Sequence, residues 1–120
     1  MAETRTTAKI VFATSDMHGN PVHMSEKTWG HIEKRHPEMA GFQEAVKDAV
    51  NDPDGSRDST LSASCQFYEA FGTGPTSTGV RVLVGYDDIS YEAGTTRGWV
   101  VTAYPPDPLI PSNVGPLKAR

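Results

Sequence analysis

The spacing of the apolar residues changes after about residue 51 of this chain, from a helical period to the alternation of strands. A helix is expected from Ser25, a good N-cap, to His36, because Pro37 cannot continue it. A second helix is expected from Phe42 to Asn51, where apolar residues recur at positions i, i+3, i+4, i+7 and i+8. Strands are then expected at residues 59–64, 66–71, 81–86 and 98–104.

This order of elements predicts an α+β domain with an antiparallel sheet. Short strands are also expected before the helices, at residues 10–12 and 22–24. The length of 120 residues fits one domain, which we assign to residues 8–105. Residues 1–7 are expected to be a flexible N-terminus. Residues 106–120 are expected to be an extended, proline-rich tail, because proline recurs too often for a helix or a central strand.

The composition disfavours several classes of protein. There is no apolar run as long as a membrane helix and no signal peptide at the start, so we expect a cytoplasmic protein, or one that a carrier delivers to a target cell. Cys65 is the only cysteine, which excludes an intrachain disulfide and a thiolate zinc site. The formal net charge of -4 argues against a surface that attracts nucleic acid as a whole, but a local basic patch remains open.

The first expected helix carries the densest group of chemically active side chains, in the sequence T-W-G-H-I-E-K-R-H-P-E. His31 and Arg35 are one helical turn apart and share a face, while Trp29, Ile32 and His36 form a neighbouring stripe. The apolar stripe docks the helix, so the charged face must border the surface on which the helix packs. If that surface is the concave side of the sheet, the cluster lines a cleft.

The last expected strand carries a second group of candidate residues. Side chains alternate along a strand, so Val100, Thr102 and Tyr104 are expected on one face. Two hydroxyl groups therefore reach one side of the strand near its end. Tyr68 supplies a third hydroxyl on the strand expected at residues 66–71, in a position to reach a pocket.

These segments together resemble a known family. W-G-H-I-E-K-R-H-P-E, a second helix before a turn that contains proline, an aromatic strand around Tyr68, a valine-rich strand and V-V-T-A-Y-P are similar to the phage and polymorphic-toxin nucleases of the BECR fold, named after barnase, EndoU, colicins and RelE. The resemblance covers Trp29 to Pro105. It implies one or two N-terminal helices on a four-stranded, or slightly larger, antiparallel sheet.

The resemblance also implies an activity, that of a small endoribonuclease that needs no metal or other cofactor. The resemblance implies that RNA is the substrate and that the protein is phage-associated or a toxin effector. It also implies an antidote or immunity protein as a partner. Such cleavage uses the 2′-hydroxyl of RNA as nucleophile, so the protein must supply a base, an acid and cations for the phosphorane. Histidine suits the first two tasks and arginine the third. The candidate catalytic residues are His31, Arg35, His36, Thr102 and Tyr104, and the candidate substrate-binding residues are Lys34 and Tyr68.

Within this set, His31 or His36 is the expected base or acid, Arg35 the phosphate clamp, and the two hydroxyl groups of the last strand the donors to the phosphate. Each of these residues also has a purely structural interpretation. In that interpretation, His36 only caps the helix end, and His31 and Arg35 form a solvated face of the helix. A metal site is disfavoured because the histidines lack an HExxH spacing. The alternative function is a non-catalytic module that binds another protein through the cleft or the tail.

Overall fold

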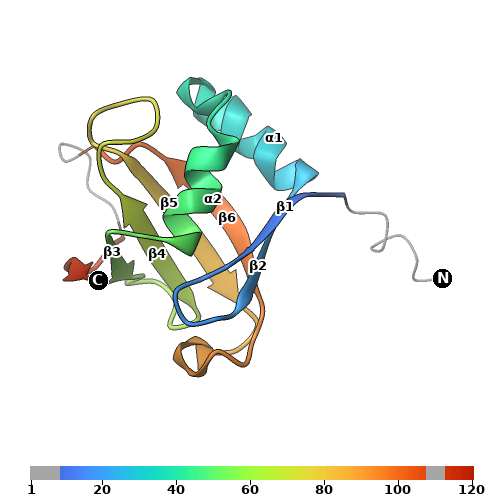
Figure 1. Cartoon of the computed structure of the whole chain (residues 1–120), viewed down its shortest axis with the longest axis vertical. Coiled ribbons are helices and arrows are strands. Elements are labelled where there is room, and N and C mark those ends of the chain that lie inside the picture. Colours follow the sequence, from blue (N-terminus) through green and yellow to red (C-terminus); the bar gives the residue numbers. More distant parts are fainter. Residues whose placement is uncertain (1–8, 108–112) are drawn as a thin grey trace.

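The described part of the chain, residues 9–107 and 113–120 of this computed structural model, forms one mixed sheet of seven strands with two α-helices on one face (Figure 1). The expected flexible N-terminus, residues 1–7, lies outside the described residues. The strand order is β1-β2-β6-β5-β4-β3-β7. The elements are β1 (Ile10–Ser15), β2 (Pro21–Ser25), α1 (Glu26–Arg35), the 3-10 turn η2 (Pro37–Met39), α2 (Gln43–Asn51), β3 (Gly55–Asp58), β4 (Cys65–Ala70), β5 (Val80–Tyr86), the 3-10 turn η3 (Tyr91–Ala93), β6 (Gly98–Tyr104) and β7 (Lys118–Ala119).

The expected α+β class is confirmed, but the sheet is larger than four strands and is partly parallel. The N-terminal hairpin of β1 and β2 joins the sheet through a short parallel pairing, in which Val22 lies beside Gly98 and His23 beside Trp99. At the other edge, β7 pairs with β3. The sequence predicts the two strands of the hairpin, at residues 10–12 and 22–24, but it predicts neither the pairing of β2 with β6 nor β7, because each of these pairings is only two residues long.

The two helices form where the sequence predicts them. The Ser25 hydroxyl accepts a hydrogen bond from the backbone N of Thr28 at 3.1 Å, which caps α1. At the other end, the backbone N of His36 donates to Ile32 O at 2.7 Å before Pro37 stops the helix. Trp29 and Ile32 are buried, so α1 packs on the sheet through the expected stripe.

The prediction of a strand at residues 59–64 is wrong. The strand of this region, β3, lies earlier in the sequence, and the residues that follow it form a loop. Its serines offer the backbone other partners: the Ser59 hydroxyl accepts from the backbone N of Leu61 at 3.2 Å, and the Ser62 hydroxyl accepts from the backbone N of Ser64 at 3.3 Å. Such local bonds compete with a strand ladder.

The face of β6 on which each side chain lies also differs from the expectation. Val100 is buried in the core under the helices, whereas Thr102 and Tyr104 face the other side of the sheet. The register with β5 shifts between Leu83 and Val84, which leaves Val101 as the extra residue of a β-bulge. The bulge breaks the strict alternation that the sequence predicts.

The core between sheet and helices contains a buried polar network as well as apolar side chains. Tyr68 and Tyr86 share a hydrogen bond of 2.6 Å between their hydroxyl oxygens, and the Tyr86 hydroxyl donates to Asp16 Oδ2. Asp16 Oδ2 also accepts from Asn20 Nδ2 at 2.9 Å. This network fastens the turn between β1 and β2 to the central strands.

Burial raises the pKa of Tyr68 and of Tyr86 well above that of an ordinary tyrosine. The folded protein keeps both phenols protonated, whereas the unfolded chain loses these protons above about pH 10. The stability that the two residues contribute is therefore fully present below about pH 10 and is lost as the pH rises further. Because burial also raises the pKa of Tyr91, we expect tyrosinate absorbance to show at least two of the four tyrosines un-ionised in native protein at about pH 11. Ionisation of all four while the protein stays folded would contradict the buried network.

Candidate active site

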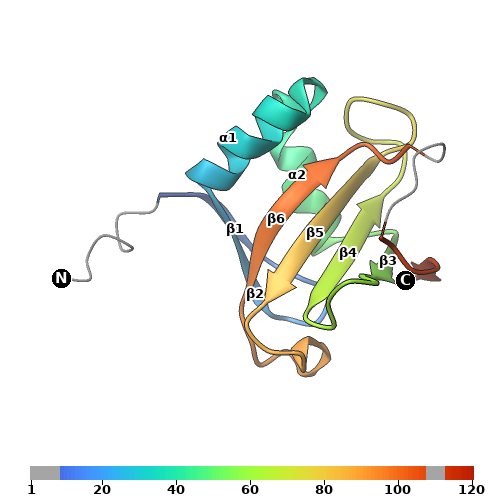
Figure 2. The same ribbon diagram turned by 180° about the vertical axis from the view of Figure 1, so that it is seen from behind.

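A cleft of about 980 Å³ lies on the face of the sheet that the helices leave open. In its floor, Leu83 of β5 lies opposite Thr102 of β6 and opposite Phe67 of β4. Figure 2 views this face, with strands β3 to β6 in front of α2. The cleft is lined by His31, Arg35, His36, Glu38, Ser59, Leu61, Phe67, Thr76, Thr78, Arg81, Leu83, Val101, Thr102, Tyr104, Pro105, Pro106, Asp107 and Asn113.

The C-terminal end of α1 brings the helix cluster to this cleft. His31 and Arg35 line it one turn apart, and His36 lines it directly after the helix. The ring of His36 stacks on Tyr104, with ring centroids 5.5 Å apart and an angle of 28° between the planes. His36 Nδ1 also lies 3.9 Å from Glu38 Oε2, a partner for the imidazole when it is protonated.

The structure thus brings five of the seven candidate residues to one cleft, although almost seventy positions separate the helix group from Thr102 and Tyr104. The bulge in β6 makes this possible, because it turns both hydroxyl side chains away from the core. The catalytic roles of the five residues stay predictions.

The two candidate substrate-binding residues lie elsewhere. Lys34 is exposed on α1 and is not among the residues that line the cleft. Tyr68 is 0% exposed and lies on the helix side of the sheet, where its hydroxyl bonds to Tyr86. The expectation that Tyr68 stacks on a base is therefore wrong. Side chains alternate between the two faces along β4, so it is the neighbouring residue, Phe67, whose side chain faces the cleft.

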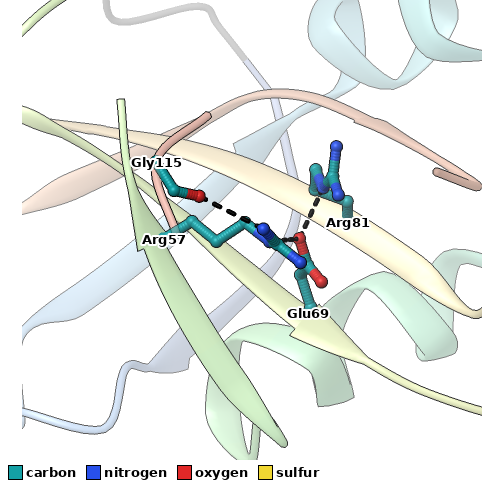
Figure 3. Close-up of polar contacts among 4 residues, drawn as sticks. All are labelled: Arg57, Glu69, Arg81 and Gly115. Atoms are coloured by element: carbon teal, nitrogen blue, oxygen red, sulfur yellow. Dashed lines mark hydrogen bonds and ion pairs between the residues drawn. The ribbon is translucent and has the colours of Figure 1, made fainter. Parts of the chain in front are cut away.

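Arg81 is a cleft residue that the sequence interpretation missed. Its guanidinium lies over the ring of Tyr104, with Cζ 5.9 Å from the ring centroid. The carboxylate of Glu69 binds this guanidinium and that of Arg57: Glu69 Oε2 accepts a hydrogen bond from Arg81 Nε at 2.5 Å and one from Arg57 Nε at 2.7 Å (Figure 3). Arg57 Nη1 donates in turn to Gly115 O at 3.1 Å. The available signal was an arginine inside the valine-rich run V-R-V-L-V.

The cleft therefore combines imidazoles, guanidinium groups and hydroxyl groups, which can bind an anion and move a proton beside it. Tyr104 is central to this arrangement because it contacts both His36 and Arg81. Within the described residues, no group of three or more histidine, cysteine, aspartate or glutamate side chains is placed to hold a metal ion. The described helices include none long and apolar enough to cross a membrane.

Nothing matches this chain in comparisons with protein-family models, with curated proteins and with solved structures. Any inference of function therefore depends on the cleft and on the sequence motifs that form it.

Removing the Glu69 carboxylate should strongly destabilise the protein. Glu69→Ala leaves the arginines of β3 and β5 without their shared acceptor in a place where Glu69 itself is only 2% exposed. We expect the free energy of unfolding, measured in a denaturant titration, to fall by about 3–5 kcal/mol.

The matched control is Asp87→Ala, which removes a carboxylate from the exposed ion pair with Arg97. The expected loss there is at most about 1 kcal/mol, because exposed pairs are screened by solvent. Equal effects of the two substitutions would show that the Glu69 network does not stabilise the sheet.

Proposed function

We propose that this protein is a small endoribonuclease that needs no metal and cleaves RNA by general acid-base catalysis. One observation carries the proposal: His31, Arg35, His36 and Arg81 line the same cleft. Together they supply the proton-transfer groups and the cations that phosphodiester cleavage requires. The resemblance of the two end motifs to BECR nucleases supports the same activity.

In the proposed reaction, the 2′-hydroxyl of RNA attacks the neighbouring phosphorus and the bond to the 5′-oxygen of the next nucleotide breaks. One of the two imidazoles, His31 or His36, takes the proton of the 2′-hydroxyl, and the other gives a proton to the leaving oxygen. The products are a 2′,3′-cyclic phosphate and a 5′-hydroxyl. Glu38 lies beside one of these imidazoles, with its Oε2 atom 3.9 Å from Nδ1 of His36.

The negative charge of the phosphorane would be held by guanidinium and hydroxyl groups. Arg35 approaches from the helix end and Arg81 from the floor of the cleft. Because Glu69 fixes Arg81 Nε, this cation is oriented before any substrate binds. Thr102 and Tyr104 can donate hydrogen bonds to the same phosphate.

Single-stranded or loop RNA is the proposed substrate, since the cationic groups gather in one cleft and the chain has a net charge of -4. The resemblance extends the proposal to a phage-associated or toxin protein, with an antidote or immunity protein that blocks the cleft.

A protein-interaction module is the second candidate function. It is favoured by the exposed apolar side chains of Leu61 and Val101 in the cleft wall. Exposed apolar surface of this kind is common at sites that bind other proteins.

Arg35→Ala should lower the rate of RNA cleavage by about two orders of magnitude or more, because one preorganised group that stabilises charge is lost. Cleavage of a fluorogenic single-stranded RNA in excess EDTA measures this effect. Lys34→Ala is the matched control, since Lys34 is the neighbouring exposed cation outside the cleft. Both variants should unfold at nearly the temperature of the parent, because exposed cations contribute little to folding.

RNA left intact by the parent protein at high concentration, from about pH 5 to about pH 9 and with any inhibitory partner removed, would favour the interaction module. Equal losses of activity in Arg35→Ala and Lys34→Ala would exclude a special role of Arg35.

A further inference from the structure

Strand β6 has different neighbours along its length. Its first residues pair with β2, where His23 lies beside Trp99. Its C-terminal half runs beside α1 (Figure 2), and its last residues line the cleft. Val100 points into the core, so the preceding side chain, that of Trp99, lies on the open face of the sheet. The open face thus continues past the cleft to an aromatic residue that the proposed reaction does not use.

Trp99 forms a layered group with its neighbours. The His23 ring lies 5.0 Å from the Trp99 ring at an angle of 35°, and the Arg97 guanidinium lies 5.5 Å from the centroid of the same ring. His23 Nδ1 is buried and has no hydrogen-bond partner among the described residues, so no hydrogen bond from this nitrogen competes with the ring contact. On β5, the residue opposite Trp99 is Gly85, which has no side chain to cover the indole.

This group is continuous with the cleft through the bulged residue Val101. Val101 lines the cleft, is 50% exposed, and has its Cγ2 atom 3.4 Å from the place where a Cβ of Gly85 would stand. Thr102 is three residues from Trp99, a distance of about 10 Å along a strand. A nucleotide next to one bound in the cleft would therefore reach Trp99 without leaving the sheet surface.

We propose that Trp99, supported by His23, is a stacking platform for the base of a nucleotide next to the scissile phosphate, and that Arg97 contacts the phosphate of that nucleotide. This inference rests on the proposed ribonuclease function and adds a second subsite to it. Arg97 now pairs with Asp87 at 3.2 Å, and both side chains are exposed, so the pair is weak enough to exchange for a phosphate.

The chemistry of the surface favours a nucleic acid strand over a peptide. A flat ring beside a cation complements a base that is linked to a phosphate, and stacking of this kind accepts any base. The surface leads to a cleft whose lining includes the guanidinium groups of Arg35 and Arg81 as well as the carboxylates of Glu38 and Asp107, and the phosphates of the occupant would lie beside the arginines. Single-stranded RNA meets both conditions.

Binding of oligodeoxyadenylates of one to four nucleotides tests the platform, because these probes lack the 2′-hydroxyl and cannot be cleaved. In the parent protein, affinity measured by calorimetry should rise by about tenfold or more from one to three nucleotides, the usual effect of a stacked base. In Trp99→Ala the rise should shrink to about threefold or less. Trp99→Phe retains a ring and should restore most of the rise, which separates stacking from a defect in folding.

Ile89→Ala is the matched control. Ile89 is a large apolar residue, 68% exposed, in the loop after β5 and outside the cleft. This substitution should leave the dependence of affinity on probe length unchanged. Arg97→Ala should weaken the binding of the longer probes and lower the salt dependence of their affinity, because one phosphate contact is lost.

The outcomes distinguish the platform from the activity. If RNA is cleaved but Trp99→Ala keeps the full increase of affinity with probe length, the proposed stacking role of Trp99 is wrong and the proposed ribonuclease activity is supported. If the increase of affinity with probe length depends on Trp99 but RNA stays intact, the surface binds single strands and the proposed activity is wrong. If no probe binds the parent protein, the platform is overturned, and a protein partner becomes the better interpretation of this surface.

Discussion

The buried carboxylate of Glu69 is the constraint on which the open face of the sheet depends. It joins the arginines of β3 and β5, and through Arg57 it reaches the backbone of Gly115 in the C-terminal segment. The guanidinium of Arg81, which this carboxylate holds, is part of the lining of the cleft. A buried carboxylate costs too much free energy to remain unpaired. The same pairing therefore stabilises the sheet and makes its surface suitable for an anion.

The two faces of the sheet differ in composition and in role. On the helix side, valine, methionine and tyrosine side chains are packed with little polar content beyond the network around Asp16 and Tyr86. That side can supply most of the stability through apolar burial. The open side carries charge and hydroxyl groups and remains accessible. Tyr104 links its parts, because its ring contacts both the helix-end imidazole of His36 and the guanidinium of Arg81.

Local signals in the sequence were sufficient for the helices and for the helix part of the site. Ser25, Pro37 and the Trp29 and Ile32 stripe determine where α1 begins, ends and packs, so the side on which His31 and Arg35 lie could be predicted. The pairing of strands could not, because the parallel contact of β2 and the return of β7 depend on residues distant in sequence. The bulge at Val101 and the role of Arg81 were missed for the same reason: both are properties of strand register, and register is set by neighbouring strands.

The direct passage from β2 to α1 has a mechanical consequence. β2 ends at Ser25 and α1 begins at Glu26, so no linker lies between strand and helix. The helix is a rigid arm of about 14 Å, at 1.5 Å per residue, and it carries its imidazole and guanidinium groups near the far end. The hairpin and the helix are held on the sheet together, by the pairing of β2 with β6, by the hydrogen bond from the Tyr86 hydroxyl to Asp16 and by the buried stripe of α1. The position of Arg35 over the cleft is therefore fixed by the same contacts that fix the N-terminal hairpin.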